Sequence, residues 1–136
     1  MIVGIGIDLI EIERIRSIYR RHGERFINRI LTPNEAIYVL QHKDPAARLA
    51  GRWAIKEAAL KALGTGLSDG IHWRDIEVLS DPRGKPVLTL HGKAHERATD
   101  IHANIFHATI THCDSLAMAQ VILENWATVH HRAQPK

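Results

Sequence analysis

The stretch GIGIDL, residues 4–9, places a carboxylate and two glycines in an otherwise apolar segment. Branched apolar residues occupy every second position from 3 to 9, and this period of two predicts a β-strand. The opposite face of the strand then carries Gly4, Gly6 and Asp8. An acid in that position is either a strand-end residue beside a helix N-terminus or a group that binds a ligand. The choice depends on the partners that the rest of the chain offers to Asp8.

The size and composition of the chain favour a single globular domain. Its 136 residues are too few for two nucleotide-binding lobes. No apolar run approaches the roughly 18 residues of a membrane span, and the first residues show no signal-peptide pattern. A single cysteine, Cys113, leaves no internal disulfide and is typical of a reducing compartment. We therefore expect a cytoplasmic protein that does not enter a membrane.

Hydrophobic periodicity and turn residues predict one domain over 1–126 and a polar tail over 127–136. The predicted fold is α+β, in which a small antiparallel sheet packs against the long helix that bears Glu57. The expected helices cover 11–26, with Gly23 as a point of interruption, 32–42, 46–63 and 92–103, and the expected strands cover 2–9, 76–80, 86–90, 105–112 and 115–124.

A cluster of arginines follows the first strand, although the net charge of the whole chain is only +3. At about 100° per residue, Arg14, Arg21 and Arg25 project within roughly 40° of one another and away from the apolar stripe of the predicted helix. Arg16 and Arg20 project elsewhere. We call Arg14, Arg21 and Arg25 the arginine ridge. Such a ridge is either a solvated helix face or a docking surface for an anionic partner.

The predicted helix over 46–63 carries three ionisable residues in unusual surroundings. Lys56 lies close to its apolar stripe, where an ammonium group is costly unless it reaches a partner. Glu57 and Lys61 project over a row of alanines, either as a surface ion pair or toward a ligand that the small side chains admit. The glycines at 64–66 follow the helix, and a helix C-terminus repels phosphate. Any anion there must be held by side chains or by loop N–H groups.

Four motifs occur in a fixed order along the chain: VGIGIDLIEIERI (3–15), RWAIKEAALKALGTG (52–66), GKPVLTL (84–90) and HATITHCDSLAMAQVI (107–122). In sequence and order they resemble the holo-acyl-carrier-protein synthases, the short bacterial 4'-phosphopantetheinyl transferases. Enzymes of this family use magnesium to transfer 4'-phosphopantetheine from coenzyme A to a serine of apo-acyl carrier protein, in fatty acid biosynthesis. They release adenosine 3',5'-bisphosphate. The resemblance implies the family fold, a small antiparallel sheet on a long helix, and a homotrimer with active sites between subunits.

The resemblance also implies roles for particular residues. Asp8 and Glu57 match the two carboxylates that hold Mg²⁺, a hard ion usually bound by one or two carboxylates, phosphate oxygens and water. Lys61 matches a catalytic lysine that adds positive charge to the pyrophosphate. The glycines before Asp8 would let the metal, with the substrate phosphate and its water, approach the strand. Which group accepts the serine proton stays open between Glu57 and a metal-bound hydroxide. The residues that match the coenzyme A site are Arg48, Gly64, Thr65, Gly66, Pro86 and His112.

One motif departs from the family pattern. Thr109 and Thr111 stand where serines are usual, and Cys113 stands where an acid is common, so the hydroxyl groups are kept but the detailed contacts differ. The resemblance also makes the arginine ridge the docking surface for acyl carrier protein, a small acidic partner.

Three other functions compete with this one. GIGIDL also resembles the first phosphate loop of actin-like kinases, which need two lobes and a longer chain. A dinucleotide-binding reading fails because no third glycine completes the G-x-G-x-x-G fingerprint. A non-enzymatic basic adaptor for an acidic protein or RNA would use the arginine ridge but leave Asp8, Lys56 and Glu57 without a role. The sequence therefore predicts an enzyme with no nucleic-acid partner.

Overall fold

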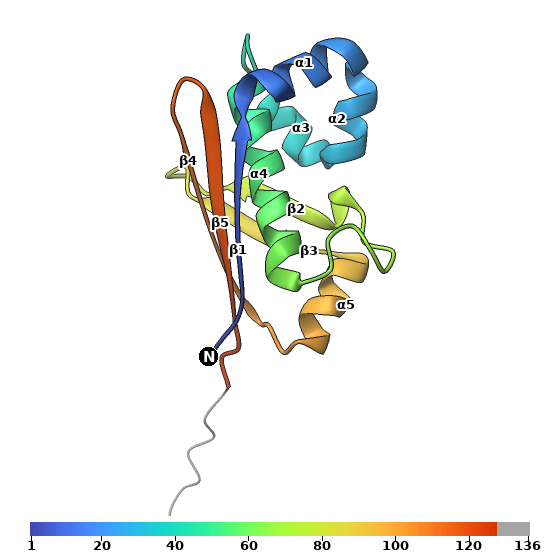
Figure 1. Cartoon of the computed structure of the whole chain (residues 1–136), viewed down its shortest axis with the longest axis vertical. Helices are drawn as coiled ribbons and strands as arrows, with labels where there is room; N and C mark the ends of the chain where they lie inside the picture. The colour runs from blue at the N-terminus through green and yellow to red at the C-terminus, as the bar shows by residue number, and fades with distance from the viewer. Residues whose placement is uncertain (128–136) are drawn as a thin grey trace, which may run out of the picture.

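A three-stranded antiparallel sheet packs against one long helix in the computed structural model, which describes residues 1–127 (Figure 1). The sheet has the strand order β1-β5-β4. Its strands are β1 (Ile2–Glu11), β4 (Ile105–His112) and β5 (Leu116–Glu124), and the long helix is α4 (Ala46–Leu63). The predicted α+β fold, with a small sheet on a long helix, is confirmed.

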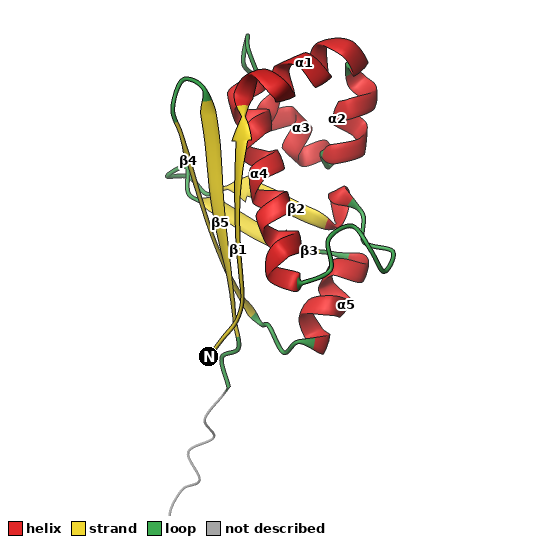
Figure 2. Cartoon of the chain, viewed as in Figure 1, coloured by secondary structure: helices red, strands yellow, loops and turns green. Residues whose placement is uncertain are grey.

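The remaining elements complete the domain around α4. They are α1 (Ile12–His22), α2 (Glu24–Ile30), α3 (Pro33–Val39), the 3₁₀-helix η1 (Trp73–Asp75), the hairpin strands β2 (Ile76–Ser80) and β3 (Pro86–Leu90), and α5 (Gly92–Asp100). Figure 2 shows helices on one side of the three-stranded sheet only. The first three helices gather where α4 begins, and α5 lies near the end of α4 (Figure 1).

The predicted elements differ from the structure mainly at their ends. The first predicted helix is broken at Gly23, where φ is 54°, so it becomes the two helices α1 and α2. The predicted polar tail begins at Ala127, and its other residues lie outside the described part of the chain. Within residues 1–127, no helix combines the length and the apolar character needed to cross a bilayer.

Backbone atoms of β1 and α4 touch directly because β1 has no side chains at two inward positions. A Cβ atom on Gly6 would lie 1.7 Å from the carbonyl oxygen of Ala58, and one on Gly4 would lie 2.2 Å from that of Ala62. The expectation that these glycines clear space for a metal and its substrate is therefore wrong. They clear space for the backbone of α4, and this contact holds Asp8, the next inward residue of β1, against the helix.

Three alternating apolar side chains of β1 point away from the core, whereas Ile10 of the same strand lies in it. Ile5, Ile7 and Leu9 are 58%, 52% and 58% exposed. Strand pairing places Gln120 of β5 and then Thr109 of β4 beside Ile7, so this outward face becomes more polar from β1 to β4. A regular row of exposed branched residues on one strand is typical of a surface that another protein covers.

Lys56 is completely buried and fully hydrogen-bonded. Its three N–H groups face four acceptors: Glu35 Oε1 at 2.7 Å and the carbonyl oxygens of Ile30 at 2.7 Å, Ile76 at 2.6 Å and, at the longer distance of 3.2 Å, Trp73. Burial lowers the pKa of Lys56, and the neighbouring carboxylate opposes that shift. The partner that the sequence required for this ammonium group is therefore present.

Glu35 links the same point to two further segments. Its Oε1 accepts a hydrogen bond from the N–H of Thr32 at 2.8 Å, which completes the predicted capping box of α3, and its Oε2 accepts one from the N–H of Val78 at 3.0 Å. One buried ion pair thus joins the ends of α2 and α3 to α4, η1 and β2. Removing one partner of such a pair typically costs about 3–5 kcal/mol.

We expect Gly6→Ala to destabilise the fold strongly, because the new methyl group would overlap the carbonyl of Ala58. The free energy of unfolding, measured by urea titration of tryptophan fluorescence, should fall by about 3 kcal/mol or more. Gly51→Ala is the matched control: its Cβ would meet only the side chain of Ile110, with Cγ2 at 3.3 Å and Cδ1 at 3.8 Å, and it gains helix propensity. Equal unfolding midpoints for the two variants would contradict the direct contact.

Candidate active site

Three of the predicted catalytic residues meet where β1 crosses α4. Lys61 Nζ lies 3.3 Å from Asp8 Oδ1 and donates to the carbonyl oxygen of Ile7 at 2.9 Å. Glu57 lies one helical turn before Lys61 on α4. The ammonium group of Lys61 thus pairs with the strand carboxylate, and the ion pair between Glu57 and Lys61 that the spacing alone suggested does not form.

The two carboxylates face the same space. Partial burial raises the pKa of Glu57, the Asp8 charge raises it further, and Lys61 opposes both effects. Asp8 Oδ2 is buried and has no hydrogen-bond partner among the described residues. A buried carboxylate oxygen without a partner is costly. The site therefore has one unsatisfied anionic oxygen beside a second carboxylate.

This arrangement fits a hard divalent cation. Within residues 1–127, no group of three or more acidic, histidine or cysteine side chains converges on one point. Mg²⁺ does not need such a group, because one or two carboxylates commonly bind it together with phosphate oxygens of a substrate and water. Asp8 and Glu57 are of the right chemical type and number for such a site.

The predicted glycine loop begins where α4 ends, one turn beyond Lys61. Gly64 adopts the left-handed conformation, with φ 75° and ψ 18°, and its N–H bonds to the carbonyl oxygens of Leu60 and Lys61. Gly66 also has a positive φ, of 58°. Gly64 follows Glu57 by seven positions, almost two full helical turns, so the loop starts on the flank of α4 that carries Glu57.

The other predicted coenzyme A residues form a second cluster. Arg48, Pro86 and His112 line one cleft of about 290 Å³ together with Tyr38, Ala47, Gly51, Arg52, Ser80, Gly84 and Ile110. Glu57 follows Arg48 by nine positions, or two and a half helical turns, so the two residues lie on opposite flanks of α4. One chain therefore does not bring all the predicted site residues together.

The sequence analysis missed two residues of this cleft. Arg52 is only 6% exposed, stacks over the ring of Tyr38 with its Cζ 4.6 Å from the ring centroid, and donates to Ser80 Oγ at 3.1 Å. Its Nε is buried and has no partner among the described residues. A hydrogen bond from Arg48 lowers the pKa of the Tyr38 hydroxyl. Two guanidinium groups thus line one cleft, and the motif containing Arg52 was the only signal in the sequence.

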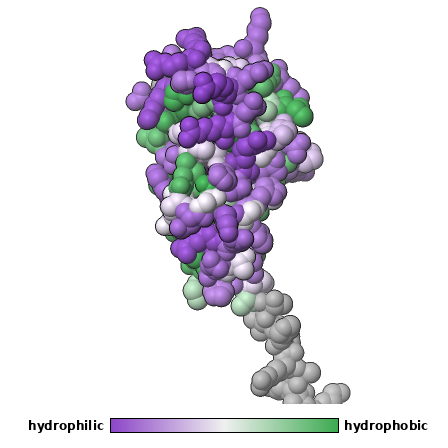
Figure 3. Space-filling view, turned by 90° about the vertical axis from the view of Figure 1, so that its right-hand side faces the viewer, coloured by the Kyte–Doolittle hydropathy of each residue, from purple (hydrophilic) through white to green (hydrophobic). Residues whose placement is uncertain are grey.

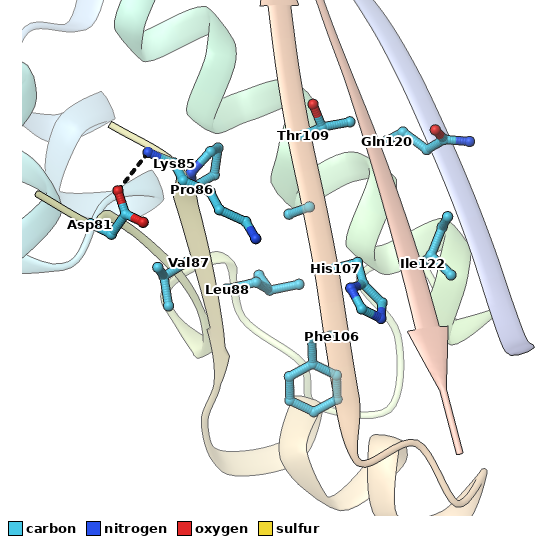
Figure 4. A pocket seen from close by; sticks show the side chains of 11 residues that line it. Asp81, Lys85, Pro86, Val87, Leu88, Phe106, His107, Thr109, Gln120 and Ile122 are labelled. Atoms are coloured by element: carbon cyan, nitrogen blue, oxygen red, sulfur yellow. Dashed lines mark hydrogen bonds between the residues drawn. The ribbon is translucent and has the colours of Figure 1, made fainter. Parts of the chain in front are cut away.

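The threonines of the departing motif lie on the other face of the sheet from His112. Thr109 lines a cleft of about 450 Å³ between the hairpin and the outward face of β4 and β5, with Lys85, His107 and Gln120 (Figure 4). Alternation along β4 turns His112 toward α4 and Thr111 outward. Pro86 lines both clefts, so the hairpin separates them.

The arginine ridge differs from its prediction in one respect. Arg14 and Arg21 lie on α1, but Arg25 lies on α2 because Gly23 breaks the helix, so a single helical wheel does not describe all three. All three are exposed, and none forms an ion pair with another described residue. In contrast, Arg16 pairs with Asp44 at 2.8 Å.

An apolar groove of about 490 Å³ lies beside Arg25. Its apolar lining consists of Ile18, Phe26, Ile30, Trp53, Leu67 and Trp73, and His22, Arg25 and Arg29 add polar groups. Trp53 and Trp73 stack with their ring centroids 4.7 Å apart. The space-filling view of this helical side shows mainly hydrophilic surface interrupted by hydrophobic patches (Figure 3).

Fold and site together define a transferase class. The family model of the 4'-phosphopantetheinyl transferase superfamily matches residues 4–121. A holo-acyl-carrier-protein synthase of Nitratidesulfovibrio vulgaris (strain DP4) is 54% identical over 125 residues, which are 92% of this chain and 100% of that protein. A holo-acyl-carrier-protein synthase of Solibacter usitatus is 46% identical over 125 residues, again 92% of this chain and 100% of that protein.

Solved structures agree with these relatives. The holo-acyl-carrier-protein synthase of Bacillus anthracis str. Ames, in complex with CoA (3',5'-ADP), has a TM-score of 0.78 and 41% identity, covering 93% of this chain and 99% of that one. The enzyme of Neisseria meningitidis has a TM-score of 0.84 and 31% identity, covering 92% and 100%. The chain belongs to the holo-acyl-carrier-protein synthases of this superfamily, as the motifs predicted.

We expect Asp8→Asn to lower the pKa of Glu57, because it removes a like charge from the same space while the burial of Glu57 remains. Lys61→Met is the opposite control and should raise that pKa, since it removes the opposing cation. A ¹³C NMR titration of the Glu57 carboxyl group in metal-free protein measures both. An unchanged pKa in Asp8→Asn would show that the two carboxylates do not share one site.

Proposed function

We propose that this chain transfers 4'-phosphopantetheine from coenzyme A to a serine of apo-acyl carrier protein, in fatty acid biosynthesis in the cytoplasm. The observation that carries the proposal is the unsatisfied Asp8 carboxylate oxygen beside Glu57 and Lys61. Relatives of nearly the same length bear the name of this activity, and that of Bacillus anthracis was solved with CoA (3',5'-ADP) bound.

The reaction breaks the bond between the β-phosphorus of coenzyme A and the adenosine bisphosphate, and forms a bond from that phosphorus to the serine oxygen. A magnesium ion bound by Asp8 and Glu57 would stabilise charge on the phosphate oxygens. Lys61 stands beside Asp8 and can contact the same oxygens as they become more negative. The contact between β1 and α4 keeps these three side chains at a fixed separation.

The cleft around Arg48 suits the anionic end of coenzyme A. Arg48 and Arg52 supply guanidinium groups that match phosphate geometry, and Tyr38 and His112 add polar groups. This cleft and the Asp8 site lie on opposite flanks of α4, so both can serve one coenzyme only if they come from two subunits.

The outward face of the sheet supports such an assembly. Ile5, Ile7 and Leu9 form an exposed apolar row along β1, which a neighbouring subunit would bury. In a closed ring of three chains, each subunit then offers its Asp8 side to one neighbour and its Arg48 side to the other. We therefore propose a homotrimer with three active sites, each between two subunits.

We expect magnesium-dependent turnover of coenzyme A and apo-acyl carrier protein by the wild type, and strong loss of turnover in Asp8→Asn, Glu57→Gln and His112→Ala. Exchange of subunits between Asp8→Asn and His112→Ala should restore about a quarter of the wild-type rate. Each site needs an intact Asp8 from one subunit, which half of the subunits supply, and an intact His112 from its neighbour, which again half of them supply. About a quarter of the sites are therefore complete. Mass spectrometry of the carrier protein measures the transfer.

The control mixes Asp8→Asn with Glu57→Gln, which lie on the same side of α4 and cannot restore each other. Turnover restored only in the mixture of Asp8→Asn with His112→Ala would support active sites shared between subunits. If neither mixture of folded trimers regains turnover, the whole site lies within one chain. Absence of magnesium-dependent turnover in the wild type would contradict the proposed enzymatic activity. It would instead favour the non-enzymatic basic adaptor.

The arginine ridge and the apolar groove together suit a carrier protein. Acidic groups of the partner can pair with Arg14, Arg21 and Arg25, while apolar side chains enter the neighbouring groove. Exposed ion pairs contribute only about 0.2–1 kcal/mol each and are screened by salt. The ridge would therefore speed and orient the encounter, and the groove would add contact area.

We expect Arg14→Glu or Arg21→Glu to raise the apparent KM for carrier protein several-fold while the KM for coenzyme A stays nearly unchanged. The wild-type KM for carrier protein should also rise with salt. Arg20→Glu is the matched control, since Arg20 lies on the same helix but outside the ridge. Equal effects at all three positions, or no dependence on salt, would identify the ridge as a solvated helix face.

A further inference from the structure

The end of α4 presents an electrostatic problem for the proposed coenzyme A site. The loop of Gly64, Thr65 and Gly66 begins where eighteen residues of helix end. Aligned peptide dipoles place about half a negative charge at that terminus, which repels phosphate. The basic residue in the last turn of α4, Lys61, is already paired with Asp8. A further positive charge at this terminus would favour an anionic coenzyme that lies along the loop.

Arg97 of α5 supplies a charge at this position. Its Nε donates to the carbonyl oxygen of Leu63, the last residue of α4, at 2.9 Å. Its Nη2 lies 3.7 Å from the point where a Cβ on Gly64 would be. The side chain is partly buried, and Figure 1 shows α5 beside the end of α4. The guanidinium group is therefore fixed against the first residue of the loop.

The geometry leaves most of this group available. A guanidinium carries five N–H donors in a planar fork, and the bond to Leu63 uses one of them. Gly64 has no side chain between Nη2 and the loop backbone. Lys93, also on α5, instead directs its Nζ to Glu96 at 3.0 Å. Arg97 thus combines a fixed position with free donors.

We propose that Arg97 is a further coenzyme A-binding residue, whose guanidinium group contacts the pyrophosphate of the coenzyme and offsets the negative end of α4. This inference rests on the proposed function. The bond from Nε to Leu63 fixes the fork, and the η nitrogens face the space above Gly64. The pyrophosphate is the relevant group because the loop follows Lys61 by less than one turn.

The test compares three substitutions at Arg97 in the full chain. Arg97→Gln and Arg97→Met remove the charge and should weaken binding of coenzyme A about tenfold, as expected for loss of a charge-assisted hydrogen bond. Arg97→Lys keeps the charge and should retain affinity within about threefold. Calorimetry measures binding, and kinetics should show a raised KM for coenzyme A with kcat and the KM for carrier protein little changed. Lys93→Met, on the same helix, is the matched control and should bind like the wild type.

A second ligand identifies the contacted group. Dephospho-coenzyme A keeps the pyrophosphate but lacks the 3'-phosphate, so Arg97→Gln should weaken the binding of both ligands by the same factor. A loss confined to coenzyme A would overturn the assignment to the pyrophosphate. Equal weakening by Arg97→Lys and Arg97→Gln would overturn the role of charge, and reduced stability with unchanged affinity would identify Arg97 as a helix cap only.

The wild type provides a measurement that does not depend on the folding of any variant. The ¹⁵N resonance of Arg97 Nε should shift on addition of coenzyme A, and an unshifted resonance at saturation would overturn the proposal. If the wild type binds coenzyme A and transfers phosphopantetheine but Arg97 shows none of these effects, only this inference fails. Absence of coenzyme A binding by the wild type would instead contradict the proposed function.

Discussion

The direct contact between the backbones of β1 and α4 is the constraint on which the site depends. Gly4 and Gly6 allow the strand to lie on the carbonyl groups of Ala62 and Ala58, closer than any side chain would permit. Asp8, the next inward residue, is therefore held beside α4, where Lys61 pairs with it. The separation between the carboxylate of the strand and the residues of the helix is set by backbone packing, which changes little during a reaction.

A buried ion pair fixes the other side of the same helix. Lys56 and Glu35 join α4 to α2, α3, η1 and β2 through hydrogen bonds to backbone groups of these elements and to each other. Neighbours in sequence thus have different tasks, because Lys56 faces the helical layer and Glu57 faces the site. A replacement at Lys56 would act on stability first, whereas one at Glu57 would act on chemistry.

The site residues divide into two sets across α4, and this division connects the fold to the assembly. One flank presents two carboxylates and a lysine, and the other presents two guanidinium groups around a cleft. The exposed apolar row on β1 gives the chain a surface that a neighbouring subunit would cover in the proposed trimer. Assembly and completion of the proposed active sites would then be one event, so that an isolated chain would have neither a covered sheet nor a complete site.

The sequence by itself determined most of the elements and the family, and it pointed to Asp8, Glu57 and Lys61 as the residues of the proposed site, because local periodicity, capping residues and motif order are properties of short segments. The single helical wheel that predicted the direction of Arg25 failed, because Gly23, with its positive φ, separates α1 from α2. Only the tertiary structure showed which face of β1 is buried, since alternation defines two faces but not which one packs. Arg52 and Arg97 escaped the sequence analysis for a related reason: each is placed by contacts with a segment distant in the chain, and such contacts leave no local pattern.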